Sequence, residues 1–84
     1  MSMYPLILIA DDDPVVHESL GLYLESEGYE HQSAYDGQQA LEMVESLHPD
    51  LIVLDLMMPR VSGIDLCRTV RQTSTLPIIM LTAK

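Results

Sequence analysis

Three aspartates that follow two apolar segments of the chain could together bind a cation. Asp11 and Asp12 follow the segment Leu6 to Ala10, and Asp55 follows the segment Leu51 to Leu54. Uninterrupted apolar segments of this length are typical of strands covered on both faces, as in a parallel sheet between helices. In such sheets ligands bind at the carboxyl ends of the strands. We therefore predict that the three carboxylates converge in one crevice at that edge, with Asp55 as the candidate reactive group.

Mutual repulsion between the three carboxylates means that the predicted cluster needs a compensating positive charge. Three partly buried carboxylates repel one another, so either one of them holds a proton or a divalent cation neutralises the group. A cation explains the cluster better, and oxygen ligands without His or Cys at ligand spacing favour Mg²⁺ over Mn²⁺ or Ca²⁺ and argue against zinc. A simpler interpretation of Asp55 alone is that it turns the chain before Pro59. Asp13 has a separate explanation, because Asp followed by Pro14 is a typical helix start.

The remaining segments predict an α/β fold that would position these aspartates. Helical spacing of apolar residues predicts helices over residues 14–27, residues 38–47 and a segment after Gly63. The first helix is expected to bury Val16, Leu20, Tyr23 and Leu24. A more polar strand over residues 29–35 suits a sheet edge, and a fourth strand, which is again apolar, runs from Ile78 to Leu81. Alternating strands and helices with short loops predict right-handed βαβ units and a doubly wound parallel sheet.

Composition and charge narrow the class of protein. The chain has 84 residues, 48% of them hydrophobic and 20% charged, which indicates one small globular domain. We see neither an apolar segment of the about 20 residues that a membrane span needs nor a signal peptide, and so expect a cytoplasmic location. The formal net charge of −9 disfavours nucleic acids and anionic membranes as partners. Cys67 is expected to be a core thiol, and His17, His31 and His48 are expected to be surface residues.

The order and spacing of several short motifs resemble those of the receiver domain of two-component response regulators. The motifs are Asp11-Asp12 after an apolar strand, Gly28-Tyr29-Glu30, Asp36-Gly37 with Ala40-Leu41, Pro49-Asp50-Leu51, Asp55 with Met58-Pro59 and Gly63, and Pro77 through Thr82-Ala83. They extend over residues 1–84, which would correspond to about the first two thirds of a receiver domain, truncated after its fourth strand and without an output domain. The resemblance implies a flavodoxin-like, CheY-like sheet with strand order 2-1-3-4.

By this resemblance the chain is a phosphoacceptor module and not an enzyme. It would take a phosphoryl group onto Asp55 from a sensor histidine kinase or a phosphotransfer protein. Asp11 and Asp12 would form the acidic pair that binds Mg²⁺, Asp12 directly and Asp11 through water, while Asp55 and the backbone carbonyl of Met57 would be further ligands. Thr82 would be the hydroxyl that reports phosphorylation. The metal would offset the repulsion between the aspartate and the anionic phosphoryl group.

The chain also departs from the family pattern. Receivers carry a lysine at the end of a fifth strand that pairs with the phosphoryl group, and Lys84, two residues after Thr82, is not that lysine. We therefore expect slower phosphorylation than in a complete receiver. The alternative function is a receiver-like interaction module that is not phosphorylated. A phosphatase of the haloacid dehalogenase type also forms an aspartyl phosphate. Its motif has a second Asp two residues after the nucleophile, where this chain has Met57, and this disfavours the phosphatase alternative.

The apolar strand from Ile78 to Leu81 would lie at an edge of the sheet in this chain. Exposed apolar edges recruit other strands. Leu6, Leu8 or their neighbours are also expected to be open to water, because no second helix covers their face. We therefore expect self-association, either by pairing of two such edge strands or by exchange of segments between chains.

Overall fold

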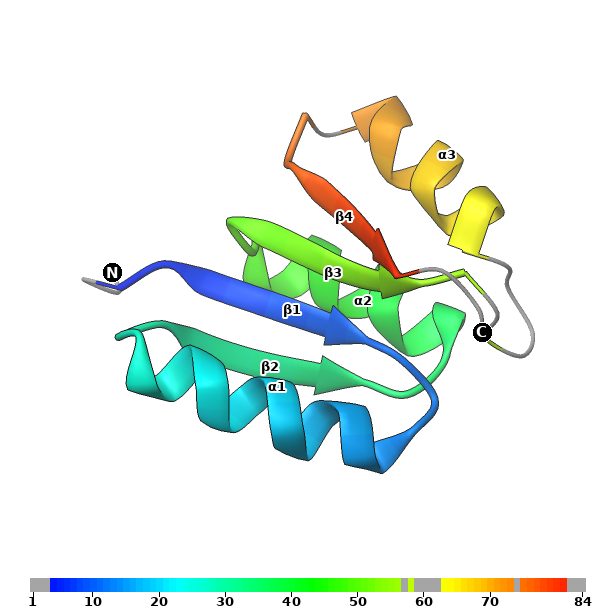
Figure 1. Cartoon of the computed structure of the whole chain (residues 1–84). Helices are drawn as coiled ribbons and strands as arrows, with labels where there is room; N and C mark the ends of the chain where they lie inside the picture. The colour runs from blue at the N-terminus through cyan, green and yellow to red at the C-terminus, as the bar shows by residue number, and fades with distance from the viewer. Residues whose placement is uncertain (1–3, 57, 59–62, 74, 82–84) are drawn as a thin grey trace.

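In the part of the chain that the structure describes, four parallel strands form a sheet that three helices cover, as the sequence predicts. The computed structural model describes residues 4–56, 58, 63–73 and 75–81. Its elements are β1 (Leu6–Ala10), α1 (Pro14–Ser26), β2 (Glu30–Ala34), α2 (Gly37–Leu47), β3 (Leu51–Asp55), α3 (Gly63–Thr73) and β4 (Ile78–Leu81). The strand pairs are parallel and the strand order is β2-β1-β3-β4 (Figure 1). The predicted fold class and strand order are both confirmed.

The helices are short, and aspartate side chains fix where the first two begin. Asp13 Oδ1 accepts a hydrogen bond from the Val15 backbone N–H at 3.0 Å, and Asp36 Oδ1 accepts one from the Gln39 N–H at 2.8 Å. These caps satisfy backbone donors at the first turn, which has no preceding turn to bond to. Within the described ranges no helix is long and apolar enough to cross a membrane.

The turn between α1 and β2 depends on a glycine. Gly28 has a φ of 85°, a left-handed conformation that residues with L side chains rarely adopt. A Cβ built at this position would meet no heavy atom within 4 Å. The next residue, Tyr29, donates its N–H to the Leu24 carbonyl at 2.9 Å and leads the chain into β2. Position 28 is therefore constrained by backbone conformation and not by space.

The two faces of the sheet carry cores of different size. α2 and α3 cover one face and α1 covers the other (Figure 1). The core beneath α2 and α3 contains Leu8, Ala10, Ala34, Ala40, Val44, Ile52, Leu54, Met58, Leu66 and Val70, with the half-buried Cys67 packed against it. The core beneath α1 contains Ile7, Ile9, Leu24 and Val53. Successive residues of β1 and β3 thus serve opposite cores, as the period of a strand requires.

The buried side of α1 differs from the predicted one. Tyr23 was expected in the core from its spacing, but its side chain is 61% exposed. The fully buried residues of this helix are His17, Gly21 and Leu24, which recur at helical spacing on one side. Tyr23 precedes Leu24 by one position, which is about 100° around the helix axis, and so it falls outside this buried side.

Exposed apolar surface lies on β4 and not on β1. The expectation that Leu6 or Leu8 would be open to water is wrong for Leu8, which is fully buried beneath α2, while Leu6 is half-buried. On the edge strand, Ile79 and Met80 are 52% and 44% exposed. These two neighbours point to opposite faces. Both faces of β4 therefore present apolar atoms to water.

Candidate metal centre

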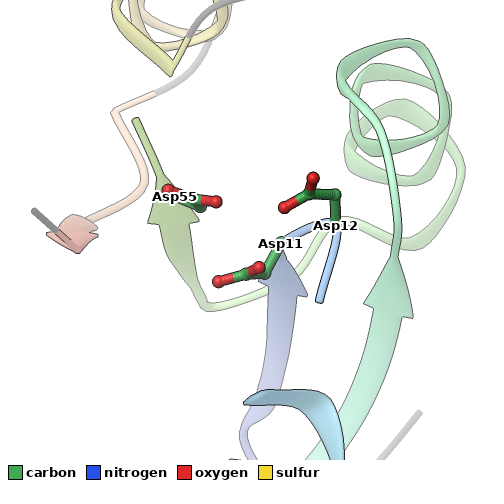
Figure 2. Close-up of side chains that lie close together, drawn as sticks. All are labelled: Asp11, Asp12 and Asp55. Atoms are coloured by element: carbon green, nitrogen blue, oxygen red, sulfur yellow. The ribbon is translucent and has the colours of Figure 1, made fainter. Parts of the chain in front are cut away.

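The register of the sheet brings the three predicted aspartates together. β1 and β3 are neighbours, and Ala10 lies opposite Leu54, so the residues that follow, Asp11 and Asp55, stand side by side at the carboxyl edge. Asp12 continues the chain from Asp11 over the same edge. One carboxylate oxygen from each of the three residues lies within 4.8 Å of the others. Figure 2 shows the carboxylates of Asp12 and Asp55 pointing toward each other across this edge.

Asp11 is the most enclosed member of the cluster. Asp11 is only 5% exposed, and its Oδ1 accepts a hydrogen bond from the Asp13 N–H at 2.8 Å. Its pKa is raised above the ordinary value, first by burial and then by repulsion from Asp55 and Asp12, against the opposing effect of the Asp13 hydrogen bond. The ionised carboxylate is therefore costly in this position until a positive charge neutralises it.

The donor set fits a small hard cation. The cluster consists of carboxylate oxygens alone, which suits Mg²⁺ better than a metal that prefers nitrogen or sulfur. Two oxygens bound to one Mg²⁺ lie at most about 4.2 Å apart, because each stands about 2.1 Å from the ion. The carboxylate oxygens of the cluster lie within 4.8 Å of one another, so one ion could be held by some of them directly and by others through water. Asp12 is exposed and Asp55 is half-buried, so an ion can reach the cluster from solvent.

Two other predicted site residues, Met57 and Thr82, lie outside the described residues, and so does Lys84. The described chain nevertheless ends next to the cluster, because Asp55 pairs with Leu81 in the register of β3 and β4. Thr82 directly follows Leu81 in the sequence. Of the five residues predicted for the site, the structure therefore brings together Asp11, Asp12 and Asp55.

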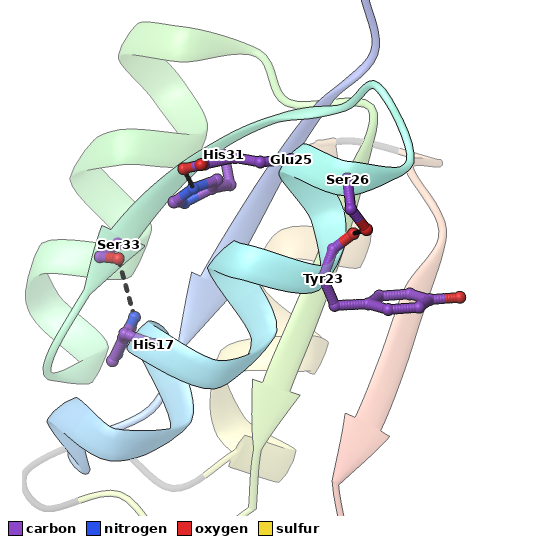
Figure 3. Close-up of polar contacts among 6 residues, drawn as sticks. All are labelled: His17, Tyr23, Glu25, Ser26, His31 and Ser33. Atoms are coloured by element: carbon purple, nitrogen blue, oxygen red, sulfur yellow. Dashed lines mark hydrogen bonds and ion pairs between the residues drawn. The ribbon is translucent and has the colours of Figure 1, made fainter.

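His17 is the residue that the sequence reasoning missed. It was expected at the surface, but it is 5% exposed and its Nε2 lies 2.7 Å from the backbone carbonyl oxygen of Asp11. Its Nδ1 lies 2.8 Å from Ser33 Oγ on β2 (Figure 3). The signal in the sequence was the helical spacing from His17 to Gly21 and Leu24, which marks the buried side of α1.

The other two histidines match the surface prediction in different degrees. His48 is exposed and adopts a left-handed conformation, with φ of 50°, at the end of α2. His31 is half-buried and pairs through Nε2 with Glu25 Oε2 at 2.7 Å (Figure 3). Neither belongs to the acidic cluster.

Comparison with known proteins agrees with this geometry. The family model for the response regulator receiver domain matches residues 7–84. The DNA-binding response regulator MtrA of Mycolicibacterium smegmatis is 49% identical over 83 residues, which cover 99% of this chain and 36% of the relative. A putative response regulator from Chloroflexus aurantiacus has a TM-score of 0.91 at 43% identity, over 96% of this chain and 69% of that one. The response regulator TrrA of Thermotoga maritima, solved in complex with Mg²⁺-BeF, has a TM-score of 0.89 at 38% identity, over 95% of this chain and 70% of that one.

The chain thus spans about a third of the length of the curated relative and about 70% of the two solved chains. The family match extends from the second residue of β1 to the last residue of the sequence and includes all three clustered aspartates. The architecture, the strand order and the position of the acidic cluster are those that the resemblance implied. The chain belongs to the response regulator receiver domain family.

Proposed function

We propose that this chain is a phosphoacceptor module of a two-component phosphorelay, in which Asp55 receives a phosphoryl group with the help of Mg²⁺. The observation that carries the proposal is the convergence of Asp11, Asp12 and Asp55 within 4.8 Å at the carboxyl edge of two adjacent parallel strands. The Mg²⁺-BeF complex of TrrA supports it, since that protein is 38% identical to this chain. The donor would be a sensor histidine kinase or a phosphotransfer protein.

In the proposed transfer, one carboxylate oxygen of Asp55 attacks the phosphorus of a phosphohistidine on the donor. The O–P bond forms as the N–P bond breaks, and the imidazole nitrogen takes the electron pair and a proton from solvent to regenerate neutral histidine. Asp12 would hold Mg²⁺ directly and Asp11 through water, with Asp55 and the Met57 carbonyl as further ligands. When bound, the ion supplies the positive charge that lets two anions meet.

The module would act as a switch and not as an enzyme. The phosphoryl group would remain bound to Asp55 after the transfer, and Thr82 would donate its hydroxyl hydrogen to a phosphoryl oxygen. This role for Thr82 rests on the resemblance and on the pairing of Asp55 with Leu81, the residue before Thr82. The words "DNA-binding" in the name of MtrA describe a relative of which this chain matches 36%. With a net charge of −9, this chain itself would be repelled by a phosphate backbone.

Intact-mass measurement after incubation with acetyl phosphate tests the proposal. We expect the chain to gain one phosphoryl group in the presence of Mg²⁺ and none when a chelator removes the ion. Asp55→Asn should abolish the gain, while Asp65→Asn, an exposed aspartate of α3 outside the cluster, should leave it unchanged. A chain that binds Mg²⁺ but gains no mass would instead be the unphosphorylated interaction module.

We also propose that this chain self-associates through β4, with a second copy as the partner. β4 is hydrogen-bonded to β3 along one edge, carries no charged residue, and exposes Ile79 and Met80. Beside it a groove of about 410 Å³ is lined by Val15, Val16, Ser19, Leu20, Tyr23 and Leu81. Pairing of two copies of β4 would extend the sheet and bury apolar surface that a lone chain leaves in water.

A further inference from the structure

We infer that His17 is a positioning residue that holds the backbone between Asp11 and Asp12 and thereby sets the geometry of the Mg²⁺ site. His17 would act on the metal site proposed above, so the inference rests on that proposal. His17 lies in α1, six residues after Asp11, and reaches back to it with a 2.7 Å contact to its carbonyl oxygen. It touches no carboxylate oxygen in these contacts, so its effect on the metal would pass through the backbone.

The hydrogen-bond partners fix the tautomer of the neutral imidazole. A backbone carbonyl can only accept, so Nε2 of His17 must carry a hydrogen and donate it to the Asp11 oxygen. In the neutral ring Nδ1 then accepts, and Ser33 Oγ, 2.8 Å away, donates its hydroxyl hydrogen to it. The Tyr35 ring packs against the imidazole with 4.3 Å between ring centroids. His17 is therefore held at Nδ1 by β2, at its ring by the residue after β2, and at Nε2 by the carbonyl of Asp11, the residue after β1.

The direction of the Asp11 carbonyl affects the geometry of the acidic cluster. The carbonyl belongs to the same rigid peptide plane as the Asp12 N–H, so its direction sets the orientation of the link between two carboxylates of the cluster. Asp11 is held at two further points, where its N–H donates to the Ala34 carbonyl at 3.1 Å and its Oδ1 accepts from the Asp13 N–H at 2.8 Å. His17 supplies the third restraint and is the one made by a side chain of α1.

A purely structural role is the competing interpretation, because a buried histidine with two satisfied nitrogens also stabilises the packing of α1 on β2. Two conservative variants separate the roles. In His17→Gln the side-chain amide nitrogen can take the place of Nε2 and donate to the Asp11 carbonyl. In His17→Asn the shorter amide can take the place of Nδ1 and reach Ser33 only. Both variants keep a polar amide in the buried position and both lose the imidazole ring, but only His17→Gln keeps a donor toward the Asp11 carbonyl.

Mg²⁺ titration of the ¹⁵N-labelled 84-residue chain, followed through its amide resonances, measures the effect. Removing a partner that orients a metal ligand typically lowers affinity at least about tenfold, and we expect that loss for His17→Asn. His17→Gln should recover most of the lost affinity. The matched control is His31→Asn, which changes a histidine at the other end of the α1–β2 contact, paired with Glu25 and not with Asp11. It should not change Mg²⁺ affinity.

A second readout needs no metal. The Asp13 N–H donates to Asp11 Oδ1, so its amide resonance in the metal-free chain reports how the Asp11 carboxylate is held. It should shift in His17→Asn and shift less in His17→Gln. Equal Mg²⁺ affinity in the two variants, or an unmoved Asp13 resonance in His17→Asn, would overturn the inference about His17. Failure of the unchanged chain to bind Mg²⁺ would overturn the proposed function itself, which is a separate outcome of the same titration.

Discussion

Leu6 and Asp50 exchange two hydrogen bonds that hold the starts of β1 and β3 side by side. The Leu6 N–H donates to Asp50 Oδ2 at 2.8 Å, and the Asp50 N–H donates to the Leu6 carbonyl at 2.8 Å. Together they secure the register in which Ala10 lies opposite Leu54 at the far end of the strands. Because a slip of one residue would turn each side chain to the other face, this pair also protects the alignment of Asp11 with Asp55.

Asp50→Ala is expected to lower the free energy of unfolding by about 1 kcal/mol, because it removes one side-chain hydrogen bond in an exposed position. Urea unfolding measures the change. Asp50→Asn retains an oxygen that can accept from Leu6 and should cost less. An unchanged urea midpoint in Asp50→Ala would show that the side-chain bond does not contribute to holding the strands.

Asp11→Asn is expected to stabilise the metal-free chain at neutral pH. The pKa of Asp11 is raised in the fold by burial and by its acidic neighbours, so the folded state binds this proton more tightly than the unfolded state. The stability that Asp11 contributes is therefore present below the usual aspartate pKa of about 3.9 and is lost as pH rises through the raised value. Asparagine stays neutral throughout and keeps an oxygen for the Asp13 N–H.

Thermal unfolding of both chains across the acidic range checks this prediction. The advantage of Asp11→Asn should be largest at neutral pH and should shrink as the pH falls below the pKa of Asp11. Added Mg²⁺ should raise the melting temperature of the unchanged chain more than that of the variant, because a ligand that binds the folded state stabilises it. A variant that is less stable at neutral pH without metal would contradict the argument.

Asp12 and Asp13 are adjacent, yet only Asp12 belongs to the acidic cluster. Asp12→Asn is expected to lower Mg²⁺ affinity by about tenfold or more, since it removes a charged oxygen ligand. Asp13→Asn removes the same charge next to it and keeps a good helix cap for the Val15 N–H. Isothermal titration with Mg²⁺ should therefore distinguish the two. Equal losses would mean that affinity follows overall charge and not the cluster.

The strands, their order and the acidic cluster could be predicted because each depends on a strong local signal. The runs Leu6 to Ala10 and Leu51 to Leu54 have no polar interruption, and each is followed directly by aspartate. Parallel strands then place both ends at one edge, whatever the details of packing. The start of α1 was predictable for the same reason, because Asp13 with Pro14 is a local signature.

The environment of His17 could not be predicted, because it depends on contacts between distant segments. A histidine in a helix is ordinarily assigned to the surface, and only the position of Ser33 and the Asp11 carbonyl in space satisfies both of its nitrogens. The prediction that Tyr23 is buried was wrong for a different reason. Hydropathy spacing identifies apolar side chains but does not tell which of two adjacent sides of a helix the sheet will cover.

Ile79→Lys is expected to prevent the self-association proposed for β4. A lysine on an edge strand disfavours pairing with another strand, because the charge would have to be buried or placed against an apolar surface. Light scattering at micromolar concentration should find a dimer for the unchanged chain and a monomer of 9.4 kDa for the variant. Leu22→Lys is the control, since Leu22 is 65% exposed on α1 and does not line the groove beside β4. A monodisperse monomer for the unchanged chain would refute the proposal.

The backbone conformation of Gly28, together with the open space around it, favours a D residue over an L residue at this position. Its φ of 85° disfavours an L side chain, but it is a favourable conformation for a D residue, and nothing stands within 4 Å of an added Cβ. A chain made by chemical synthesis with D-alanine at position 28 should gain about 0.4–1 kcal/mol, because the unfolded chain loses freedom while the fold keeps its shape. L-alanine should instead cost about 1–2 kcal/mol. The mirror-image pair thus separates backbone strain from side-chain size at the end of α1.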